Sequence, residues 1–293
     1  MGARAPASTG LTALSETFLG EGRGRSLYNG VKYLTYSLLF INVFLFLQEE
    51  LLALEHTYTD GVDLALFGQV FSSSIDTAAW VILLLLFELE TFILDDEQIR
   101  GWVKRALHWI RLLCGATIIW AFTGYLAELF AIYAVVPFDG ATACGLGADW
   151  SMIVDLDEYV PIDASNCAQF AAGAQQFEGL TILATPDILQ AAQYLAWTDV
   201  INAATWILVV IVLEVEVRLQ LRGQLTDRVV SGTRYLKYFL YSILFVAAIY
   251  WGIAGDFIDF WDASLWLFAF IFIELNVFDW QQESQHPGSE VSG

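Results

Sequence analysis

The sequence predicts an all-α membrane protein, a bundle of six transmembrane helices arranged as three helical hairpins. Three observations support this fold class. Of the 293 residues, 57% are hydrophobic and 16% are charged, whereas soluble domains carry about 25% charged residues. Six apolar stretches reach the length of about 20 residues that a bilayer-spanning helix needs. Finally, the basic residues are confined to alternate connections between these stretches.

The six apolar stretches define the order of the predicted elements. Backbone groups inside lipid must be paired within their own segment, which favours helices for all six. We expect residues 1–30 to form a flexible cytoplasmic segment and residues 282–293 a cytoplasmic tail, on either side of a membrane domain at 31–281. The predicted spans are 31–52, 75–94, 108–134, 196–217, 235–255 and 262–281, grouped into hairpins 31–94, 105–217 and 234–281.

The positions of Lys and Arg predict the orientation of the chain. Basic residues mark the cytoplasmic side of a multi-pass protein. All 13 lie before or at the start of the first span, near the junction of the second and third, or near the junction of the fourth and fifth. They are Arg4, Arg23, Arg25, Lys32, Arg100, Lys104, Arg105, Arg111, Arg218, Arg222, Arg228, Arg234 and Lys237. The sequence therefore predicts both termini on the cytoplasmic side of a plasma (inner) membrane.

The predicted outer segments are acidic and contain no Lys or Arg. They are 53–74, 134–196 and 255–262, within a chain of formal net charge -20. Such a surface has a negative potential that concentrates cations. A solvated acidic face explains the same composition without any cation function. Both interpretations stay open at this point.

The longest outer loop, 135–196, contains two of the three cysteines. Because an outer loop faces an oxidising compartment, we expect a Cys144–Cys167 disulfide. Cys114 falls inside the third span and is expected to be a packing residue. Near the end of the loop, Thr185-Pro186-Asp187 resembles a helix start with proline at the first helical position. That helix is expected to continue into the fourth span.

The even-numbered spans share one repeated pattern, namely Asp or Asn, then Trp four residues later, then Glu eight residues after the Trp, then Glu or Asn two residues further on. The second span has Asp76, Trp80, Glu88 and Glu90, the fourth has Asn202, Trp206, Glu214 and Glu216, and the sixth has Asp262, Trp266, Glu274 and Asn276. The odd-numbered spans begin with a base, then Leu two residues later and an aromatic four residues later, from Lys32, Arg105 and Arg234. Three hairpins around a pseudo-threefold axis explain both patterns, as in transporters built from parallel repeats.

The spacing within the repeat assigns a depth to each residue. Asp76 and Glu88 are 12 residues apart, about 18 Å along a helix. The Asp or Asn is therefore expected near the outer boundary, the Trp one turn deeper, and the Glu in the inner part of the membrane. Carboxylates at that depth need a partner or a water-filled cavity. The expected partners of these glutamates are the bases at the start of the odd-numbered spans, which lie near the same depth. They are Lys32, Arg105 and Arg234.

Two interpretations of these carboxylates remain open. They form either structural ion pairs that fix helix register or a ring that lines a cation path. Residues two apart on a helix point about 200° apart, so the two acids of each Glu-x-Glu cannot face the same axis. The sequence does not decide which one does.

Known catalytic motifs are absent from the sequence. The three histidines, His56, His108 and His286, fall in no HExxH or Glu-x-x-His motif. Gly145-Leu146-Gly147 is too short for a phosphate-binding loop and has no following lysine. We therefore expect no enzyme, no metal site and no cofactor. The scarcity of basic residues argues against a nucleic-acid partner.

Two functional hypotheses follow from the sequence. The first is a small cation channel or transporter that uses the membrane-embedded carboxylates. The alternative is a non-enzymatic accessory or assembly subunit of a larger membrane complex, whose aromatic-rich helices dock partners. The expected partners are the lipid bilayer, cations under the first hypothesis, and either further copies of the chain or other membrane subunits.

Overall fold

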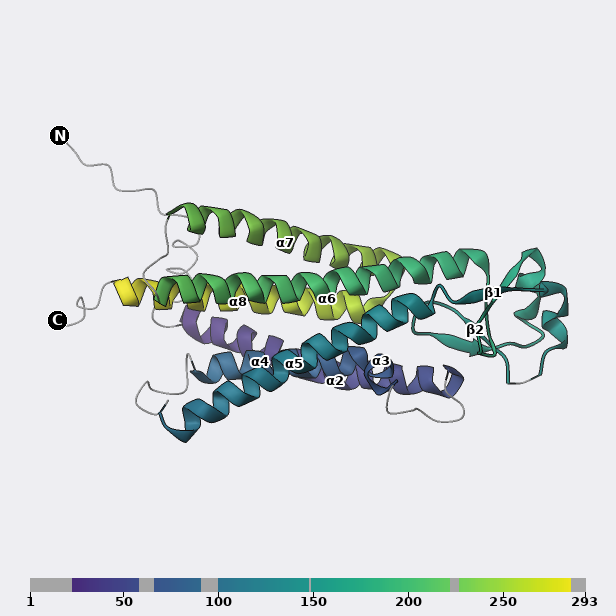
Figure 1. Cartoon of the computed structure of the whole chain (residues 1–293), viewed down its shortest axis with the longest axis horizontal. Coiled ribbons are helices and arrows are strands. Elements are labelled where there is room, and N and C mark those ends of the chain that lie inside the picture. The colour runs from purple at the N-terminus through teal and green to yellow at the C-terminus, as the bar shows by residue number, and fades with distance from the viewer. Residues whose placement is uncertain (1–22, 58–65, 91–99, 148, 222–226, 286–293) are drawn as a thin grey trace.

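The computed structural model describes residues 23–57, 66–90, 100–147, 149–221 and 227–285. Long helices lie side by side, and a small β-sheet unit sits at one end of them (Figure 1). We call this end the sheet end, and the end at which the first long helix begins the opposite end. The helices are α2 (Arg23–Thr57), α3 (Phe67–Val70), α4 (Ser72–Glu88), α5 (Trp102–Ala131), α6 (Pro186–Leu221), α7 (Asp227–Ala254) and α8 (Phe257–Gln285).

The six longer helices form a closed ring. Helix α2 packs against α4 and α8, α5 packs against α4 and α6, and α7 packs against α6 and α8. Each predicted hairpin therefore consists of two neighbouring helices, α2 with α4, α5 with α6, and α7 with α8. Because successive helices run in opposite directions, α4, α6 and α8 all start at the sheet end (Figure 1). Equivalent positions on these three helices can face one central space.

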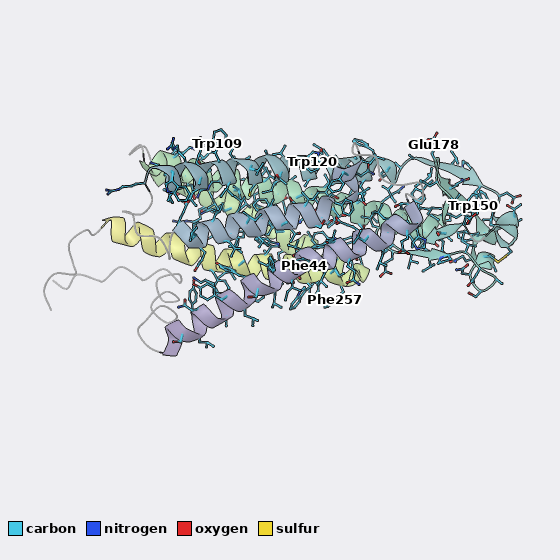
Figure 2. All side chains as sticks on the ribbon, turned by 90° about the horizontal axis from the view of Figure 1, so that it is seen from below. Phe44, Trp109, Trp120, Trp150, Glu178 and Phe257 are labelled. Atoms are coloured by element: carbon cyan, nitrogen blue, oxygen red, sulfur yellow. A yellow bond between two sulfur atoms is a disulfide. The ribbon has the colours of Figure 1, made fainter. Side chains whose placement is uncertain are left out.

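Four of the described helices are long and apolar enough to cross a membrane. They cover Ser26–Thr57, Trp102–Ala131, Pro186–Glu216 and Val229–Ala254. Helix α4 has only 17 residues, and α8 has acidic residues near its start. Large apolar side chains cover the outer faces of the helices, including Phe44 and Trp109, which are 55% and 65% exposed (Figure 2). An outer surface of this kind is compatible with a membrane protein.

The prediction of an all-α fold is wrong for the outer loop, which folds around a five-stranded sheet. The strands are β1 (Val135–Phe138), β2 (Ser151–Ile153), β3 (Tyr159–Pro161), β4 (Ala174–Phe177) and β5 (Ile182–Ala184), in the order β1-β4-β5-β2-β3. Neighbouring strands are antiparallel except β2 and β5. Strands of three or four residues are too short to show the alternation of apolar and polar residues that predicts a strand.

The sheet unit has a small hydrophobic core of its own. Phe170 and Leu183 are fully buried there and pack with Met152 and Ile162. The disulfide between Cys144 and Cys167 joins the 3-10 helices η2 (Gly140–Gly145) and η3 (Cys167–Ala172), which confirms the predicted pairing. This disulfide cross-link stabilises the unit by reducing the conformational freedom of the unfolded chain.

The predicted helix start at the end of the outer loop is confirmed. Helix α6 begins at Pro186, and the backbone N–H of Leu189 donates to the carbonyl of Thr185 at 2.9 Å. The helix is 36 residues long, so its first turns extend beyond the predicted span 196–217 toward the sheet. Leu189, Ala192 and Leu195 pack there in a core shared by the sheet and the helices.

A close approach of two glycines holds the short helix α3 against α5. A Cβ atom on Gly124 would lie 2.2 Å from the carbonyl oxygen of Gly68, and a Cβ on Gly68 would lie 2.7 Å from the ring of Trp120. A residue with a Cβ atom does not fit at either glycine unless a neighbouring group shifts. Tyr125 and Glu128, which follow Gly124 on α5, face the interior of the ring.

Candidate functional site

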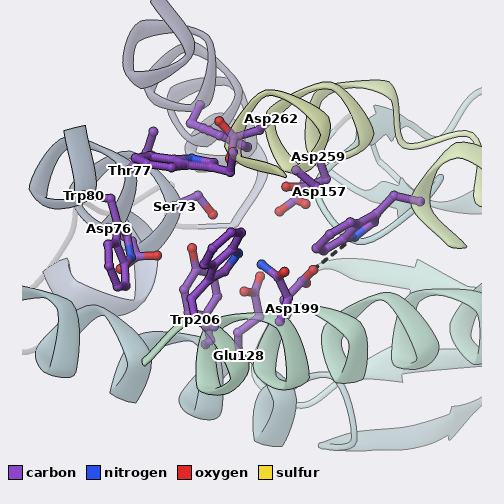
Figure 3. Close-up of a pocket in the computed structure, with 17 residues that line it drawn as sticks. Ser73, Asp76, Thr77, Trp80, Glu128, Asp157, Asp199, Trp206, Asp259 and Asp262 are labelled. Atoms are coloured by element: carbon purple, nitrogen blue, oxygen red, sulfur yellow. Dashed lines mark hydrogen bonds between the residues drawn. The ribbon is translucent and has the colours of Figure 1, made fainter. Parts of the chain in front are cut away.

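A cavity of about 50 Å³ lies inside the helix ring near the sheet end. This volume is enough for a few water molecules. Helices α2, α4, α5, α6, α7 and α8 line it, and the loop between β2 and β3 contributes one residue (Figure 3). Six carboxyl groups face the cavity: Asp76, Glu128, Asp157, Asp199, Asp259 and Asp262.

The repeated Asp/Asn and Trp positions of α4, α6 and α8 all line this one cavity. In each helix the two residues are four positions apart, so both side chains lie on the same face. The pairs are Asp76 with Trp80, Asn202 with Trp206, and Asp262 with Trp266. The structure therefore brings together all six repeat positions that were predicted near the outer boundary.

The three tryptophan rings meet at the bottom of the cavity, on the side away from the sheet. Trp266 lies between the other two, with ring centroids 6.4 Å from Trp80 and 6.3 Å from Trp206. Beyond them, fully buried apolar side chains such as Leu39, Val209 and Ala269 fill the middle of the ring. The described residues thus close the cavity toward the opposite end.

Hydrogen bonds fix two of the carboxylates. Asn42 donates from Nδ2 to Asp262 at 2.7 Å. The indole N–H of Trp251 donates to Asp199 at 3.2 Å, drawn as a dashed line in Figure 3. Two amide oxygens, Oδ1 of Asn42 and Oδ1 of Asn202, are buried without a protein partner. Because Asn202 lines the cavity, its oxygen is available to a ligand that accepts electron pairs.

No Lys, Arg or His occurs among the described residues that line the cavity, so no basic side chain there offsets its six carboxyl groups. In the loop between β2 and β3, burial and the nearby Glu128 carboxylate raise the pKa of Asp157 well above its usual range. Burial likewise raises the pKa of Asp256, which lies between α7 and α8. Carboxylate oxygens of Asp157, Asp256 and Asp259 lie within 4.8 Å of one another.

Oxygen atoms dominate the polar part of this lining, and oxygen ligands are those that hard cations such as Ca²⁺ and Mg²⁺ prefer. Ionised carboxylates in such a confined site repel one another unless a positive charge joins them. The arrangement can therefore bind protons, bind cations, or exchange one for the other.

The glutamates predicted in the inner part of the membrane lie at the opposite end of the bundle, and the structure gives them basic partners. Lys32, which is fully buried, donates to Glu88 Oε1 at 2.6 Å, and the hydroxyl of Tyr33 donates to the same oxygen at 3.0 Å. The Lys32 ammonium also lies 5.9 Å from the ring centroid of Tyr28. Of the predicted base–Glu pairings, this one is present in the structure.

The predicted pairing of Glu214 with Arg105 is wrong, and Glu90 and Glu216, for which no particular base was predicted, also have basic partners. Glu90 pairs with Arg111 at 2.5 Å, Glu216 with Lys237 at 3.1 Å, and Glu214 with Arg218 of its own helix at 2.7 Å. Arg105 and Arg234 are exposed on α5 and α7. Glu274 and Asn276 fall within α8, but their side chains lie outside the described residues, as do all predictions for residues 1–22.

Sequence reasoning missed several residues of the cavity. Glu128 and Asp199 each interrupt an otherwise apolar part of a candidate span, and a charge inside a span is a signal of a site. Asp157 and Asp259 belonged to the acidic outer segments, where a solvated surface explained them equally well. The acidic composition of these segments does not show that the two residues face one cavity. Their positions depend on how the outer loop folds.

No known protein family, no curated protein and no solved structure matches this chain.

Proposed function

We propose that this protein is a non-enzymatic membrane transporter that takes up cations into the carboxylate-lined cavity. The observation that carries the proposal is the grouping of six carboxyl groups around a small cavity whose described lining contains no basic residue. Burying one ionised carboxylate without a partner costs several kcal/mol, by order of magnitude. A cation that enters the cavity removes this cost, and so does a proton.

The lower boundary of the cavity favours a transporter over a permanently open channel. The tryptophan layer and the apolar side chains beyond it separate the cavity from the opposite end. A site that is closed on one side corresponds to one state of an alternating-access cycle. Release on the other side requires Trp80, Trp206 and Trp266 to move apart.

The arrangement of the repeats supports a pseudo-threefold organisation for the site. Each of α4, α6 and α8 contributes an Asp or Asn and a Trp to the same cavity, and the hairpins alternate around a closed ring. We propose that all six long helices cross the membrane, with α4 and α8 stabilised by their position inside the ring. Their acidic residues then face the cavity and not lipid.

The orientation that fits this function places the sheet end outside the cell. The disulfide Cys144–Cys167 lies in the sheet unit, and disulfides persist in oxidising compartments. The basic residues Lys32, Arg111 and Lys237 are found toward the opposite end, as the positive-inside rule expects for a cytoplasmic face. The cavity then opens toward the outside of a plasma membrane.

Cation flux into proteoliposomes tests this proposal. Purified protein is reconstituted, and uptake of Tl⁺ and of Ca²⁺ is followed with trapped fluorescent indicators. We expect the double variant Asp199→Asn and Asp262→Asn to lower uptake at least tenfold, because it removes two cavity charges while keeping acceptors for Trp251 and Asn42. The matched control is Glu214→Gln, which removes one charge from the exposed face of α6 and should leave uptake unchanged.

The same preparation separates the transporter from an accessory subunit. Native mass measurement after gentle detergent extraction reports whether a second type of protein accompanies the chain in fixed stoichiometry. Wild-type protein that carries no flux and copurifies with such a partner would establish the accessory role. Flux that persists in the double Asn variant would also reject the proposed site.

A further inference from the structure

A second, larger cavity lies beside the first, at the junction of the helix ring and the sheet unit. Its volume is about 180 Å³, enough for several water molecules. We call it the vestibule. Helices α2, α3 and α5 form one side, and strands β3, β4 and β5 with their connecting loops form the other. Its polar lining includes Glu50, Gln69, Glu178 and Tyr159.

Two carboxyl groups line both the vestibule and the inner cavity. They are Glu128 on α5 and Asp157 in the loop between β2 and β3. The two spaces therefore adjoin at this pair of side chains, one from the helix ring and one from the sheet unit.

The loop between β2 and β3 is built to hold Asp157 at this junction. The carboxylate of Asp155 accepts hydrogen bonds from the backbone N–H groups of Asp157 and Glu158, at 3.1 and 3.0 Å. The N–H of Val154 donates to the carbonyl of Glu158 at 2.8 Å and closes the turn. Leu156, which is 4% exposed, anchors the loop in the core between sheet and helices.

Contacts on the other side of the vestibule tie it to the helix that carries Asp76 and Trp80. Glu50 of α2 accepts hydrogen bonds from the backbone N–H groups of Ser73 and Ser74, at 2.8 and 3.1 Å. These groups are unpaired donors of the first turn of α4, so the carboxylate caps that helix. Its second oxygen, Oε2, is buried without a protein partner.

We propose that the vestibule is the access route for cations to the inner cavity, and that Glu128 and Asp157 form a selective constriction between the two spaces. This inference rests on the proposed function. It assigns a task to the sheet unit, which supplies one of the two constriction residues and one wall of the route. Opposing carboxylates at a narrow passage attract cations and exclude anions.

Site-directed labelling tests the route. In a Cys114→Ala background, Ala131→Cys places a thiol on the exposed vestibule wall, and the matched control Ala191→Cys places one on the exposed face of α6, outside both cavities. Each variant is modified with a bulky methanethiosulfonate reagent. Binding of Tl⁺ is then followed by stopped-flow quenching of tryptophan fluorescence, since four tryptophans line the inner cavity.

We expect modification of Ala131→Cys to slow quenching by Tl⁺ at least tenfold, and reduction of the adduct to restore it. Modification of Ala191→Cys should leave the rate unchanged. In unmodified protein, Asp157→Asn should slow quenching by a similar factor.

Three results would overturn the inference. If both modified variants quench as fast as wild type, cations reach the cavity by another route, and the proposed function stands without this access route. If Asp157→Asn leaves the rate unchanged, the constriction assignment is wrong. If wild-type protein shows no saturable quenching by Tl⁺, the proposed function fails and the access route fails with it.

Discussion

The two ends of the helix ring contain buried or partly buried acidic residues in opposite electrostatic settings. At the opposite end, Glu88 and Glu216 pair with Lys32 and Lys237 at 2.6 and 3.1 Å. At the sheet end, six carboxyl groups surround one cavity and no described lining residue is basic. Glu88, Glu216 and four of the six cavity carboxyl groups lie in α4, α6 and α8, the helices that share the repeat. The difference teaches that the neighbours of a buried carboxylate, and not its recurrence in the sequence, indicate its role.

This contrast changes the assignment of the repeated glutamates. The sequence singled out Glu88, Glu214 and Glu274 as either ion-path residues or structural pairs. In the structure, the charge of Glu88 is neutralised by Lys32, and Glu214 forms an exposed ion pair with Arg218. Charge neutralised by a fixed base leaves little attraction for a mobile cation. The cavity carboxylates, which have no such base, are the better candidates for cation binding.

The largest effect that tests this comparison is expected from Lys32→Met. The substitution leaves Glu88 buried without its base, which should lower the free energy of unfolding by about 3–5 kcal/mol. The measurement is reversible unfolding in mixed micelles, followed by tryptophan fluorescence. A loss below about 1 kcal/mol would show that the pair is not the neutralised structural unit that the geometry indicates.

A second variant distinguishes loss of the base from loss of packing. The double variant Lys32→Met with Glu88→Gln has no buried charge at this position, so it should recover most of the lost stability. If the double variant is as unstable as Lys32→Met, the lysine stem contributes mainly through packing. If it recovers, the cost came from the unpaired carboxylate.

The sheet end should respond to pH in the opposite sense from an ordinary salt-bridged acid. Burial raises the pKa of Asp157 and Asp256 in the folded protein, so these groups bind protons more tightly when folded. Their stabilising contribution is full below the unfolded pKa of about 3.9 and is lost as pH rises through the folded pKa. In cation-free buffer, Tm should therefore fall as pH rises from about 4 toward neutral.

Calorimetry with and without Ca²⁺ checks this pH dependence. At neutral pH, added Ca²⁺ should raise Tm, and the increase should shrink at acidic pH as protons occupy the same carboxyl groups. The variant Asp157→Asn with Asp256→Asn should flatten the pH dependence. A slope that is identical in this variant and in wild type would assign the effect to other groups.

The smallest effect is expected from Arg218→Ala. Its pair with Glu214 spans one turn of α6, and the two side chains are 67% and 54% exposed. Exposed pairs of this spacing contribute about 0.3–0.5 kcal/mol. The unfolding experiment used for Lys32→Met should detect a change no larger than this. A loss above about 1 kcal/mol would mean that the exposed pair has a structural role comparable to a buried one.

Much of the helical framework could be predicted from the sequence. Apolar stretches indicated the long helices, and the proline at the first helical position indicated the start of α6 at Pro186. The disulfide was predicted because its two cysteines lie in a loop expected to face an oxidising compartment. The spacing of Asp76 and Trp80, repeated on α6 and α8, identified residues that meet in the cavity. These features depend on local periodicity or on a short repeated motif, which a single sequence displays directly.

The sheet unit and four of the six cavity carboxyl groups were not predicted in this way. Strand β2 pairs with β5 about thirty residues later, and such pairing leaves no local pattern when each strand has three residues. Asp157 depends on that pairing for its position, and Glu128 depends on the packing of α5 in the ring. Sequence position assigned Asp157 to a loop, and only tertiary structure places it beside a helix carboxylate.

The glycine contact between α3 and α5 limits how the molecule can move. Backbone meets backbone at Gly68 and Gly124, so no side chain there can change its rotamer to absorb a displacement. Helix α4 begins two residues after α3 ends, and its N-terminal portion is therefore coupled mechanically to α5. Helices α3, α5 and the start of α4 are therefore expected to move as one unit, so the parting of the tryptophans that the proposed function requires would come from α6, α7 and α8.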